Sequence, residues 1–488
     1  MRAAEPAACT GADEQERRLY GWGRIASSRA RVRSASRPED VLDALLAGRS
    51  AGCGLIARGA GRSYGDAAQN GGGRVLDMTG LREIVSVDGR RQTVTVEAGV
   101  TLARLLARLW HLGLTLPVVP GTRHVTVGGA IASDVHGKSH HCDGGFARHV
   151  QSLSLCVPTG ECLDVSPEGD PELFDTTLGG MGLTGMIVQA TLRVEPLASG
   201  WVAGDLDRTA DIEQTLALLA GEEHRRWSVA WLDLLAGGPR LGRALVSRAD
   251  PWPAGVALGR TGRTLKGTGT LKGIPKGHAA GSPSGLTLSE QPIVEVPARF
   301  PGGLLRTPIV ARFNALRWHA AARRERGRAL PLASYLFPLD ALGSWNRLYG
   351  RAGLIQYQFV VPLDRDRELV RCVELLRRRR LPVYLAVLKR FGAASGGPLS
   401  FPIEGWTLAM DLPGGAPGLG QTLDELDEIV AAAGGRVYLT KDVRLRKDLL
   451  PMMYPELDRL HAQRARVDPD GVLRSDLARR LGLCEEGR

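Results

Sequence analysis

The stretch Ala57-Arg-Gly-Ala-Gly-Arg-Ser-Tyr-Gly-Asp66 decides which fold the sequence predicts. It follows a short apolar segment typical of a strand, but its glycines fall at positions 59, 61 and 65 and no helical periodicity follows. A Rossmann dinucleotide site needs a glycine turn that opens a helix, so the context argues against that fold. Two interpretations remain: a turn whose backbone N–H groups and hydroxyls suit a pyrophosphate, or a glycine-rich loop without a ligand.

Two further glycine-rich stretches follow within the first 190 residues. They read PGTRHVTVGGAIASDVHGKSHH, residues 120–141, and GGMGLTGMI, residues 179–187. Glycine has no Cβ, so another chain or a ligand can approach such a backbone closely. Three stretches of this kind around one compact unit favour a single long ligand that is contacted from several sides.

The pattern of apolar residues predicts a mixed α and β fold. In the first part we expect strands at 54–57, 75–78, 84–87 and 93–96, and an amphipathic helix with Leu102, Leu105, Leu106 and Leu109 on one face. Further on we expect strands at 356–361, 382–388, 406–412 and 437–440, with helices at 364–378 and 422–433. This βαββαβ order predicts one antiparallel sheet backed by two helices. No internal repeat is evident in the sequence.

Composition sets wide limits on function. The chain has 488 residues, 43% of them apolar and 24% charged, which predicts a globular protein of two or three domains. Its net charge of +11 is compatible with a polyanion, a phosphorylated substrate or an anionic membrane surface. Aromatic residues make up only 5%, and no nucleic-acid-binding motif is visible, so we expect no nucleic-acid partner.

Membrane and cysteine patterns suggest where the protein works. No apolar run approaches the roughly 18 residues that would span a bilayer. We therefore expect a cytoplasmic or peripherally membrane-associated protein, with the periplasmic face not excluded. The seven cysteines are odd in number and scattered, without a C-x-x-C pair, which predicts reduced thiols and no zinc ribbon.

Three histidines invite a metal interpretation. A zinc hydrolase built on His136, His140 and His141 would need the rings gathered on one face, yet no helical pattern does this and no acid or cysteine stands at ligand spacing. We therefore expect no metal site.

The three glycine-rich stretches together resemble the FAD-binding domain of the vanillyl-alcohol-oxidase, or PCMH, type. Downstream, IQYQFVVP, LKRFG, LSFPIEGWTLAMDLP, YLTKD and RVDPDGVLRSDLARRLGL resemble the decaprenylphosphoryl-β-D-ribose 2'-oxidase family, with a match from about Gly21 to Leu483. The resemblance implies an α+β protein with a two-subdomain FAD-binding domain formed by residues 1–198 and 435–488. Residues 199–434 would form an inserted substrate domain built on the antiparallel sheet, including a mobile basic loop around 251–289.

The resemblance also implies residues that hold FAD. By the family pattern they are Ala57, Arg58, Gly59, Ala60, Gly61, Arg62, Ser63, Tyr64, Gly65, Asp66, Ala67, Gly121, Thr126, Val127, Gly128, Gly129, Ser133, Asp134, Val135, His136, Ile187 and Tyr438. Many relatives have a histidine at the position of Arg62 and bond it covalently to the flavin. An arginine cannot form that bond, so we expect dissociable FAD.

The implied reaction is oxidation of the ribose 2'-hydroxyl of a polyprenyl-phosphate sugar to a ketone. This would be the first half of an epimerisation to the arabinose donor for cell-wall arabinan, completed by an NAD(P)-dependent reductase. Lys441 and His136 match catalytic positions, and Tyr64, Gln356, Gln358, Lys389 and Lys441 match positions that line the substrate pocket. Ala409 stands where well-studied members have a cysteine that nitroaromatic inhibitors attack, so covalent inhibition is not expected.

The family pattern leaves some partners open. The electron acceptor would be a quinone or oxygen, and the lipid-linked substrate suggests contact with an anionic membrane surface. The main alternative is an oxidase of the same fold that acts on a free alditol or aldonolactone.

Overall fold

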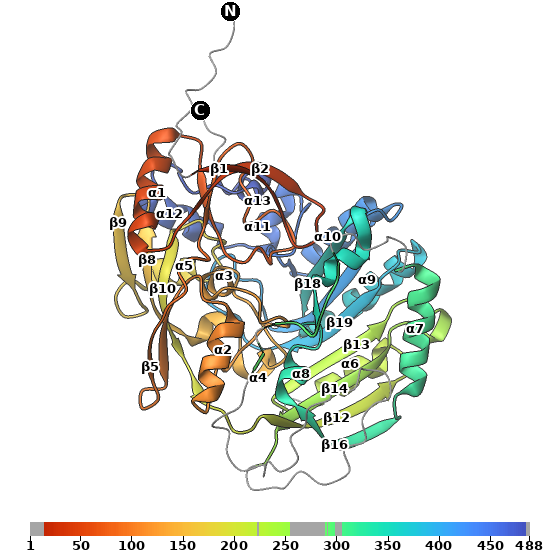
Figure 1. Cartoon of the computed structure of the whole chain (residues 1–488). Coiled ribbons are helices and arrows are strands. Elements are labelled where there is room, and N and C mark those ends of the chain that lie inside the picture. Colours follow the sequence, from red (N-terminus) through yellow and green to blue (C-terminus); the bar gives the residue numbers. More distant parts are fainter. Residues whose placement is uncertain (1–13, 222–223, 254–287, 290, 298–304, 485–488) are drawn as a thin grey trace, which may run out of the picture.

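The computed structural model describes residues 14–221, 224–253, 288–289, 291–297 and 305–484. Figure 1 shows two halves: one contains the N-terminal strands, two small sheets and the C-terminal helices, and the other is built on one large sheet. The predicted mobile basic loop falls almost entirely on residues outside the described part. In the described part, no helix has both the length and the hydropathy that a membrane crossing requires.

The first small sheet carries the glycine-rich stretch at the end of β3 (Leu55–Arg58), one of its edge strands. Its order is β1 (Gln15–Tyr20), β2 (Ser27–Ser34), β4 (Arg74–Asp77) and β3, and helix α1 (Pro38–Ala51) connects β2 to β3. β4 pairs in parallel with both neighbours. The strand predicted at 54–57 is confirmed as β3, which begins and ends one residue later than predicted.

The second small sheet is antiparallel. Its order is β5 (Ile84–Asp88), β6 (Thr93–Glu97), β10 (Met186–Arg193), β8 (Val150–Val157) and β9 (Glu161–Val165). The predicted amphipathic helix is α2 (Leu102–His111), which begins at the Thr101 cap and buries all four expected leucines. Short elements complete this half: β7 (Leu114–Thr115), α3 (Val127–Ala132), α4 (His140–Asp143), η1 (Phe146–His149), α5 (Pro171–Thr177) and β11 (Glu195–Pro196).

The large sheet has eight strands and is antiparallel throughout. Its order is β16 (Arg324–Pro331), β12 (Trp201–Thr209), β14 (Arg243–Pro251), β13 (Trp227–Asp233), β19 (Leu385–Phe391), β20 (Gly405–Pro413), β18 (Leu354–Pro362) and β21 (Arg436–Val437). With α9 (Asp366–Arg378) after β18 and α10 (Leu419–Ala432) after β20, the predicted βαββαβ unit is confirmed. Smaller elements around it are η2 (Gly238–Arg240), β15 (Val294–Glu295), α8 (Leu332–Leu336), β17 (Leu342–Gly343), η3 (Trp345–Ala352) and η4 (Leu363–Arg365).

The structure contains a repeat that the sequence did not reveal. The elements β12, α6 (Ile212–Ala220), β13, β14, α7 (Thr307–Ala320) and β16 follow the same order as the second unit, and the two units join where β13 pairs with β19. Helix α7 differs from its counterpart α10 in the face of the sheet that it covers. α7 packs with Trp231 on one face, whereas α6 and α10 belong to the cluster on the other face, which includes Ala230. This change of face, and the long segment before α7, hide the repeat in the sequence.

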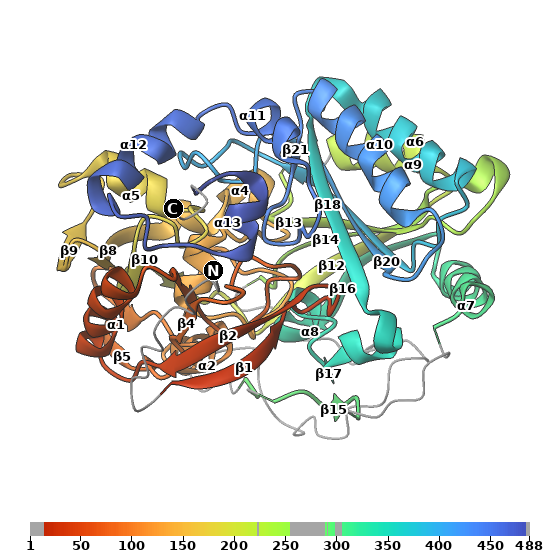
Figure 2. The ribbon, with the colours of Figure 1, turned by 90° about the horizontal axis from the view of Figure 1, so that it is seen from above.

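Alternation along β18 gives the large sheet two distinct buried faces. Tyr357 and Phe359 point toward the helices that cover the outer face, where the Tyr357 hydroxyl donates to Asp427 on α10 at 2.8 Å. Figure 2 shows α6, α9 and α10 together on that side. Gln356 and Gln358 point the other way, toward the half with the glycine-rich stretches. A polar inner face is thus set against the first half of the molecule.

The C-terminal segment returns to the first half. Its helices are η5 (Lys447–Leu449), α11 (Leu450–Met453), α12 (Leu457–Val467) and α13 (Asp476–Leu481), and Leu55 donates its N–H to Val472 at 2.8 Å. Arg480 on α13 forms ion pairs with Asp66 and Asp442. These contacts join the C-terminal segment to the first half, while β21 extends the large sheet to Val437.

One cysteine expectation is wrong. Cys156 and Cys162 form a disulfide, because the β8–β9 hairpin places them directly opposite each other with Cα atoms 4.0 Å apart. The pairing depends on hairpin register, which the number and spacing of cysteines do not reveal. Among the described residues, Cys53, Cys142, Cys372 and Cys484 form no disulfide.

Candidate active site

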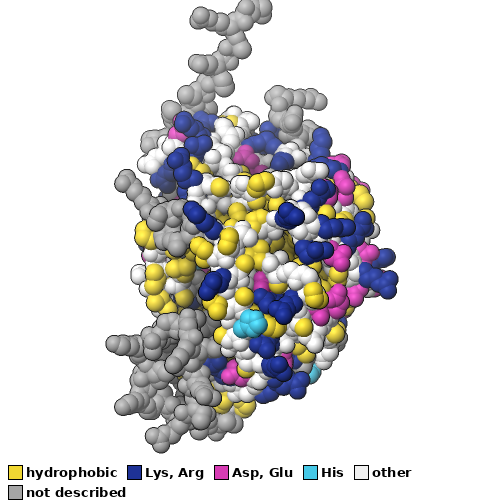
Figure 3. Space-filling model, turned by 90° about the vertical axis from the view of Figure 1, so that its right-hand side faces the viewer, with side chains coloured by type: hydrophobic (Ala, Val, Ile, Leu, Met, Phe, Trp, Pro, Cys, Tyr) yellow, Lys and Arg dark blue, Asp and Glu magenta, His cyan; other side chains and the backbone are white. Residues whose placement is uncertain are grey.

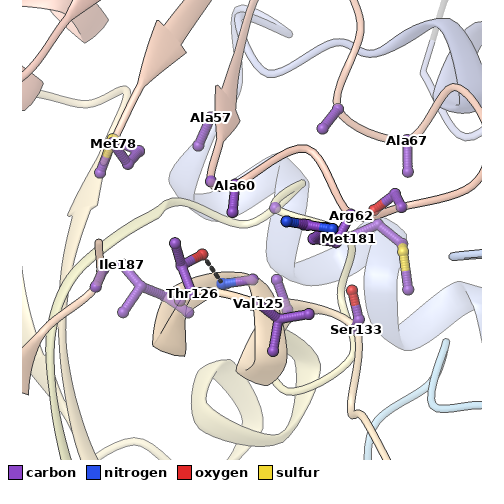
Figure 4. Close-up of a pocket in the computed structure, with 18 of the residues that line it drawn as sticks. Ala57, Ala60, Arg62, Ala67, Met78, Val125, Thr126, Ser133, Met181 and Ile187 are labelled. Carbon is purple, nitrogen blue, oxygen red and sulfur yellow. Dashed lines mark hydrogen bonds between the residues drawn. The ribbon is translucent and has the colours of Figure 1, made fainter. Parts of the chain in front are cut away.

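The three glycine-rich stretches meet around one pocket of about 970 Å³, its open mouth included. Figure 4 shows side chains from residues 57–67, 125–133 and 181–187 around the same space. The lining includes these residues of the FAD expectation: Ala57, Gly59, Ala60, Gly61, Arg62, Ser63, Ala67, Thr126, Gly128, Gly129, Ser133, Val135 and Ile187.

The turn at residues 59–63 has the backbone of an anion-binding nest. Within the described part of the chain, none of its five consecutive N–H groups donates to a protein acceptor. Gly61 has φ +64°, and the turn ends where Tyr64 donates its N–H to the Thr440 carbonyl at 3.0 Å. Free donors of this kind bind phosphate oxygens. The turn therefore fits the pyrophosphate of a dinucleotide.

Arg62, a residue of this turn, has an unpaired hydrogen-bond donor among the described residues. Its Nε is buried and has no hydrogen-bond partner among the described residues, while its guanidinium carbon lies 4.0 Å from the centre of the Trp22 ring. A buried unpaired donor is costly, so this group also fits an anionic ligand.

A tight contact holds two of the glycine stretches together. A Cβ added at Gly59 would lie 2.1 Å from Thr126 Oγ1, the atom that accepts the Gly129 N–H at 3.3 Å and caps α3. The dashed line in Figure 4 marks this capping bond. Glycine at 59 is therefore required by chain packing at the pocket wall, a reason that the sequence pattern alone did not supply.

Several residues of the FAD expectation do not line this pocket: Arg58, Tyr64, Gly65, Asp66, Gly121, Val127, Asp134, His136 and Tyr438. Some of them hold the surrounding chain instead. Arg58 donates to the Ala68 carbonyl at 2.9 Å, and Asp134 accepts the Ala147 N–H at 2.9 Å. The Tyr438 hydroxyl donates to the Ser133 carbonyl at 2.8 Å.

Sequence reasoning missed other lining residues, namely Ala68, Met78, Ala98, Val125, Ala132, Thr177, Met181, Gly182, Gly185 and Thr440. Met181, Gly182 and Gly185 belong to the third glycine-rich stretch, so the motif itself was a usable signal for them. Ala98 and Met78 come just after strands β6 and β4, and only the arrangement of the two small sheets brings them together.

A polar cluster lies where the loop after α3 meets the inner face of the large sheet. Gln358 Nε2 lies 3.0 Å from His136 Nε2 and 2.9 Å from Thr407 Oγ1. Lys389 Nζ lies 3.1 Å from His136 Nδ1. Cross-strand pairing places Ala409 opposite Gln358 on the same face. Of the predicted substrate residues, Gln358 and Lys389 are therefore in direct contact with His136.

Both ring nitrogens of His136 have polar partners. Thr407 Oγ1 donates to the Phe359 carbonyl at 2.9 Å, so it accepts from Gln358, whose amide then donates to His136 Nε2 as well. Lys389 Nζ faces the other ring nitrogen, Nδ1, at 3.1 Å, so both nitrogens of His136 are engaged. Burial, followed by the charge of Lys441, holds the pKa of Lys389 well below its usual value. Burial and the charge of Lys389 lower the pKa of His136 in the same way.

Lys441 approaches this cluster from the loop after β21. Its Nζ lies 5.6 Å from the Tyr64 ring centre and 5.9 Å from that of Tyr438. Burial lowers the pKa of Lys441 to about 8, and the carboxylate of Asp411 opposes this shift. Burial also raises the pKa of Asp411, to about 6, although Gln356 donates to this carboxylate. Unlike Lys389, Lys441 makes no side-chain hydrogen bond among the described residues.

The three histidines have separate partners. His141 Nε2 lies 2.7 Å from the Arg225 carbonyl, and the His140 ring packs 4.2 Å from the Phe391 ring. In the described ranges, no group of three His, Cys, Asp or Glu side chains is placed to hold a metal ion.

A match to a known family of FAD-binding domains covers part of the sequence that forms the pocket. The model of the family described as "FAD binding domain" matches residues 30–166, which include the first two glycine-rich stretches. The protein is thus an FAD-dependent oxidoreductase with a PCMH-type FAD-binding domain.

Full-length relatives identify the family. The chain is 40% identical over 471 residues to decaprenylphosphoryl-β-D-ribose oxidase of Mycolicibacterium smegmatis, a match that covers 96% of this chain and 98% of the relative. It belongs to the decaprenylphosphoryl-β-D-ribose oxidase family. L-gulono-1,4-lactone dehydrogenase of Mycobacterium tuberculosis is 26% identical over 94% of this chain and 96% of the relative. L-galactono-1,4-lactone dehydrogenase 2 of Oryza sativa is 30% identical over 38% of this chain and 30% of the relative.

Proposed function

We propose that this protein oxidises the 2'-hydroxyl of a polyprenylphosphoryl-β-D-ribofuranose to the 2'-ketone. The observation that carries the proposal is a group of half-buried lysines near the FAD pocket. Lys389 Nζ lies 3.1 Å from His136 Nδ1, Lys441 follows the pocket residue Thr440, and the charge of Lys138 also acts on Lys389. The relative named as decaprenylphosphoryl-β-D-ribose oxidase supports this substrate. The product would be the intermediate from which the arabinose donor for cell-wall arabinan is made.

The group of lysines favours an anionic substrate over a free lactone or alditol. The charges of Lys138 and Lys441 both act on Lys389, and the Asp411 carboxylate is the acidic group that acts on Lys441. Burial lowers the pKa of each lysine, to about 7 for Lys138. Lys138 and Lys389 take up protons when a phosphate arrives, because a nearby opposite charge favours the charged form. A neutral sugar lactone offers no such partner, so lactone oxidation is the alternative that this cluster disfavours.

The residues around the pocket fit FAD. The N–H groups of residues 59–63 and the buried Nε of Arg62 would bind its pyrophosphate, and the glycines at 128, 129, 182 and 185 leave room for its rings. When bound, FAD supplies the acceptor for the hydride that leaves the ribose C2. The remaining task falls to the protein: it must hold the sugar in place and remove the hydroxyl proton.

We assign the role of proton acceptor to Lys441 rather than to His136. Both ring nitrogens of His136 are already bonded, one to Gln358 and one to Lys389. Lys441 has a free amine, and a pKa of about 8 leaves part of it neutral near physiological pH. A general base works best with a pKa close to the working pH. His136 then acts by orienting Lys389, and Tyr64, Gln356 and Gln358 complete the substrate pocket.

Partners follow from this chemistry. The ketone requires an NAD(P)-dependent reductase to complete epimerisation, and reoxidation of the flavin requires an acceptor such as a quinone or oxygen. A polyprenyl chain lies in a membrane, so the protein works at a lipid surface, on either its cytoplasmic or its periplasmic face.

The decisive experiment is anaerobic mixing of the purified flavoprotein with candidate substrates. Polyprenylphosphoryl ribose is expected to bleach the flavin absorbance near 450 nm within seconds. L-gulono-1,4-lactone and free alditols should bleach it far more slowly at equal concentration. Rapid bleaching by the lactone and none by the phosphorylated sugar would show that the protein is a lactone oxidase.

We also expect the cofactor to be dissociable. Arg62 lies in the pocket wall, and a guanidinium does not form the covalent bond to flavin that a histidine at this position could form. After acid precipitation, all yellow colour should appear in the supernatant. Colour retained in the pellet would contradict this prediction.

A further inference from the structure

Helix α7 presents an apolar stripe to solvent. Ile309, Phe313 and Leu316 are 52%, 58% and 61% exposed, and their spacing of i, i+4 and i+7 places them on one side of the helix. The opposite side is fixed to the large sheet. There the Asn314 amide donates to Asp233 at 3.1 Å, and the Trp318 ring N–H donates to the Thr209 carbonyl at 3.0 Å. These anchors keep the apolar stripe turned outward.

Positive charge borders this stripe on both sides. At about 100° per residue, Arg312 and His319 fall along one edge of the stripe and Arg306 along the other. The side chains of Arg306 and Arg312 form no ion pair or hydrogen bond with the described residues. From Val296 to Arg324 the sequence has six arginines and no acidic residue. Figure 3 views the molecule from the side of α7, where hydrophobic side chains and Lys or Arg side chains lie next to one another.

A line of aromatic rings connects this helix to the active site. The ring centres of Tyr64 and Trp345 are 6.5 Å apart, those of Trp345 and Tyr349 are 6.4 Å apart, and those of Tyr349 and Tyr384 are 6.0 Å apart. The Tyr384 hydroxyl lies 3.4 Å from Oγ1 of Thr307, the first residue of α7. All four rings are only partly buried. They form a line of aromatic rings between Lys441, whose Nζ lies 5.6 Å from the Tyr64 ring centre, and the start of α7.

We propose that the outward face of α7 docks on an anionic lipid bilayer, and that the isoprenoid chain of the substrate reaches the active site along the four rings. A helix with an apolar face bordered by basic residues is the usual form of an interfacial membrane helix. Each basic residue near an anionic bilayer contributes about 1 kcal/mol of attraction. The part of the proposal that concerns the isoprenoid chain rests on the proposed function, whereas bilayer docking does not.

A second copy of the chain is a poorer occupant of this face. A stable dimer buries about 1,200–2,000 Å² in total, far more than three side chains on one helix provide. A twofold interface also sets each patch against itself, which would bring the unpaired Arg306 and Arg312 side chains close to their own counterparts. Anionic lipid headgroups instead complement these charges.

The test is vesicle co-sedimentation of the full-length flavoprotein. Vesicles of phosphatidylcholine with added phosphatidylglycerol should bind it, and pure phosphatidylcholine vesicles should bind it much less. The double substitution Phe313→Ser with Leu316→Ser is expected to weaken binding at least about tenfold, because two large apolar side chains leave the bilayer. Arg306→Gln with Arg312→Gln should weaken only the preference for the anionic lipid, again about tenfold.

The matched control is Met452→Ser on α11, which removes a side chain that is 56% exposed but lies in the other half of the molecule. It should leave vesicle binding unchanged. Equal binding by the Phe313/Leu316 variant and the unaltered protein, or no binding of the unaltered protein to anionic vesicles, overturns the proposal. A lower sedimentation coefficient of this variant in the absence of vesicles would show that the α7 face joins two copies of the chain, and would overturn the proposal.

Activity distinguishes this proposal from the proposed function. If the function is right, the Phe313/Leu316 variant should oxidise vesicle-borne substrate with a raised KM but a short-chain, water-soluble analogue at the normal rate. If neither substrate reduces the flavin while vesicle binding still depends on α7, the proposed function fails and bilayer docking stands.

Discussion

Replacing Lys441 with methionine is expected to lower kcat by about a thousandfold, within the roughly 10²–10⁴-fold that a general base contributes. The substitution removes the free amine that approaches Tyr64 while keeping an unbranched side chain of similar length. Thr440, not Lys441, lines the cofactor pocket, so the flavin content should stay normal. Stopped-flow reduction of the flavin by substrate measures the effect. The control is Lys447→Met, because Lys447 is exposed and lies six residues further along.

The pH profile tests the same role. A base must be neutral to accept a proton, so kcat should rise as the pH rises through about 8 and then level off, following the pKa of Lys441. Asp411→Asn removes the negative charge that raises this pKa, and the rise should then occur at lower pH. The methionine variant should lose the inflection altogether. An unchanged inflection in that variant would assign the proton to another group.

Gly59→Ala is expected to weaken FAD binding about 5- to 150-fold, the equivalent of the roughly 1–3 kcal/mol that overpacking costs. The new Cβ would meet Thr126 Oγ1 at 2.1 Å and push the first two glycine-rich stretches apart. Fluorescence titration of the apoprotein with FAD gives the dissociation constant.

Thr126→Ala should partly rescue this variant, because removing Oγ1 leaves the Thr126 Cβ at 3.2 Å as the nearest remaining atom of that side chain. By itself, Thr126→Ala should cost about 1 kcal/mol of stability through loss of the α3 cap. Gly89→Ala is the neutral control, since a Cβ there meets no atom within 4 Å. Additive losses in the double variant would show that Gly59 and Thr126 act separately.

The elements most faithfully predicted were those with strong periodicity. The leucines of α2 are buried as their spacing predicted, because the side-chain period of a helix follows from backbone geometry alone. The predicted glycine-rich stretches do converge on one pocket. The sequence did not predict that Ala98 and Met78 line the pocket. Each follows a strand and belongs to no motif, and only the packing of the two small sheets brings it to the pocket wall.

The sequence by itself determined the βαββαβ unit and the three close-approach turns, since both depend on local spacing of apolar residues and glycines. Tertiary structure alone decided that Cys156 meets Cys162, that α7 turns an apolar stripe outward, and that His136 is bonded on both sides while Lys441 is not. These outcomes depend on register and packing between segments as far apart as residues 136 and 389. Such long-range contacts set burial, and burial sets which amine is neutral and free to accept a proton.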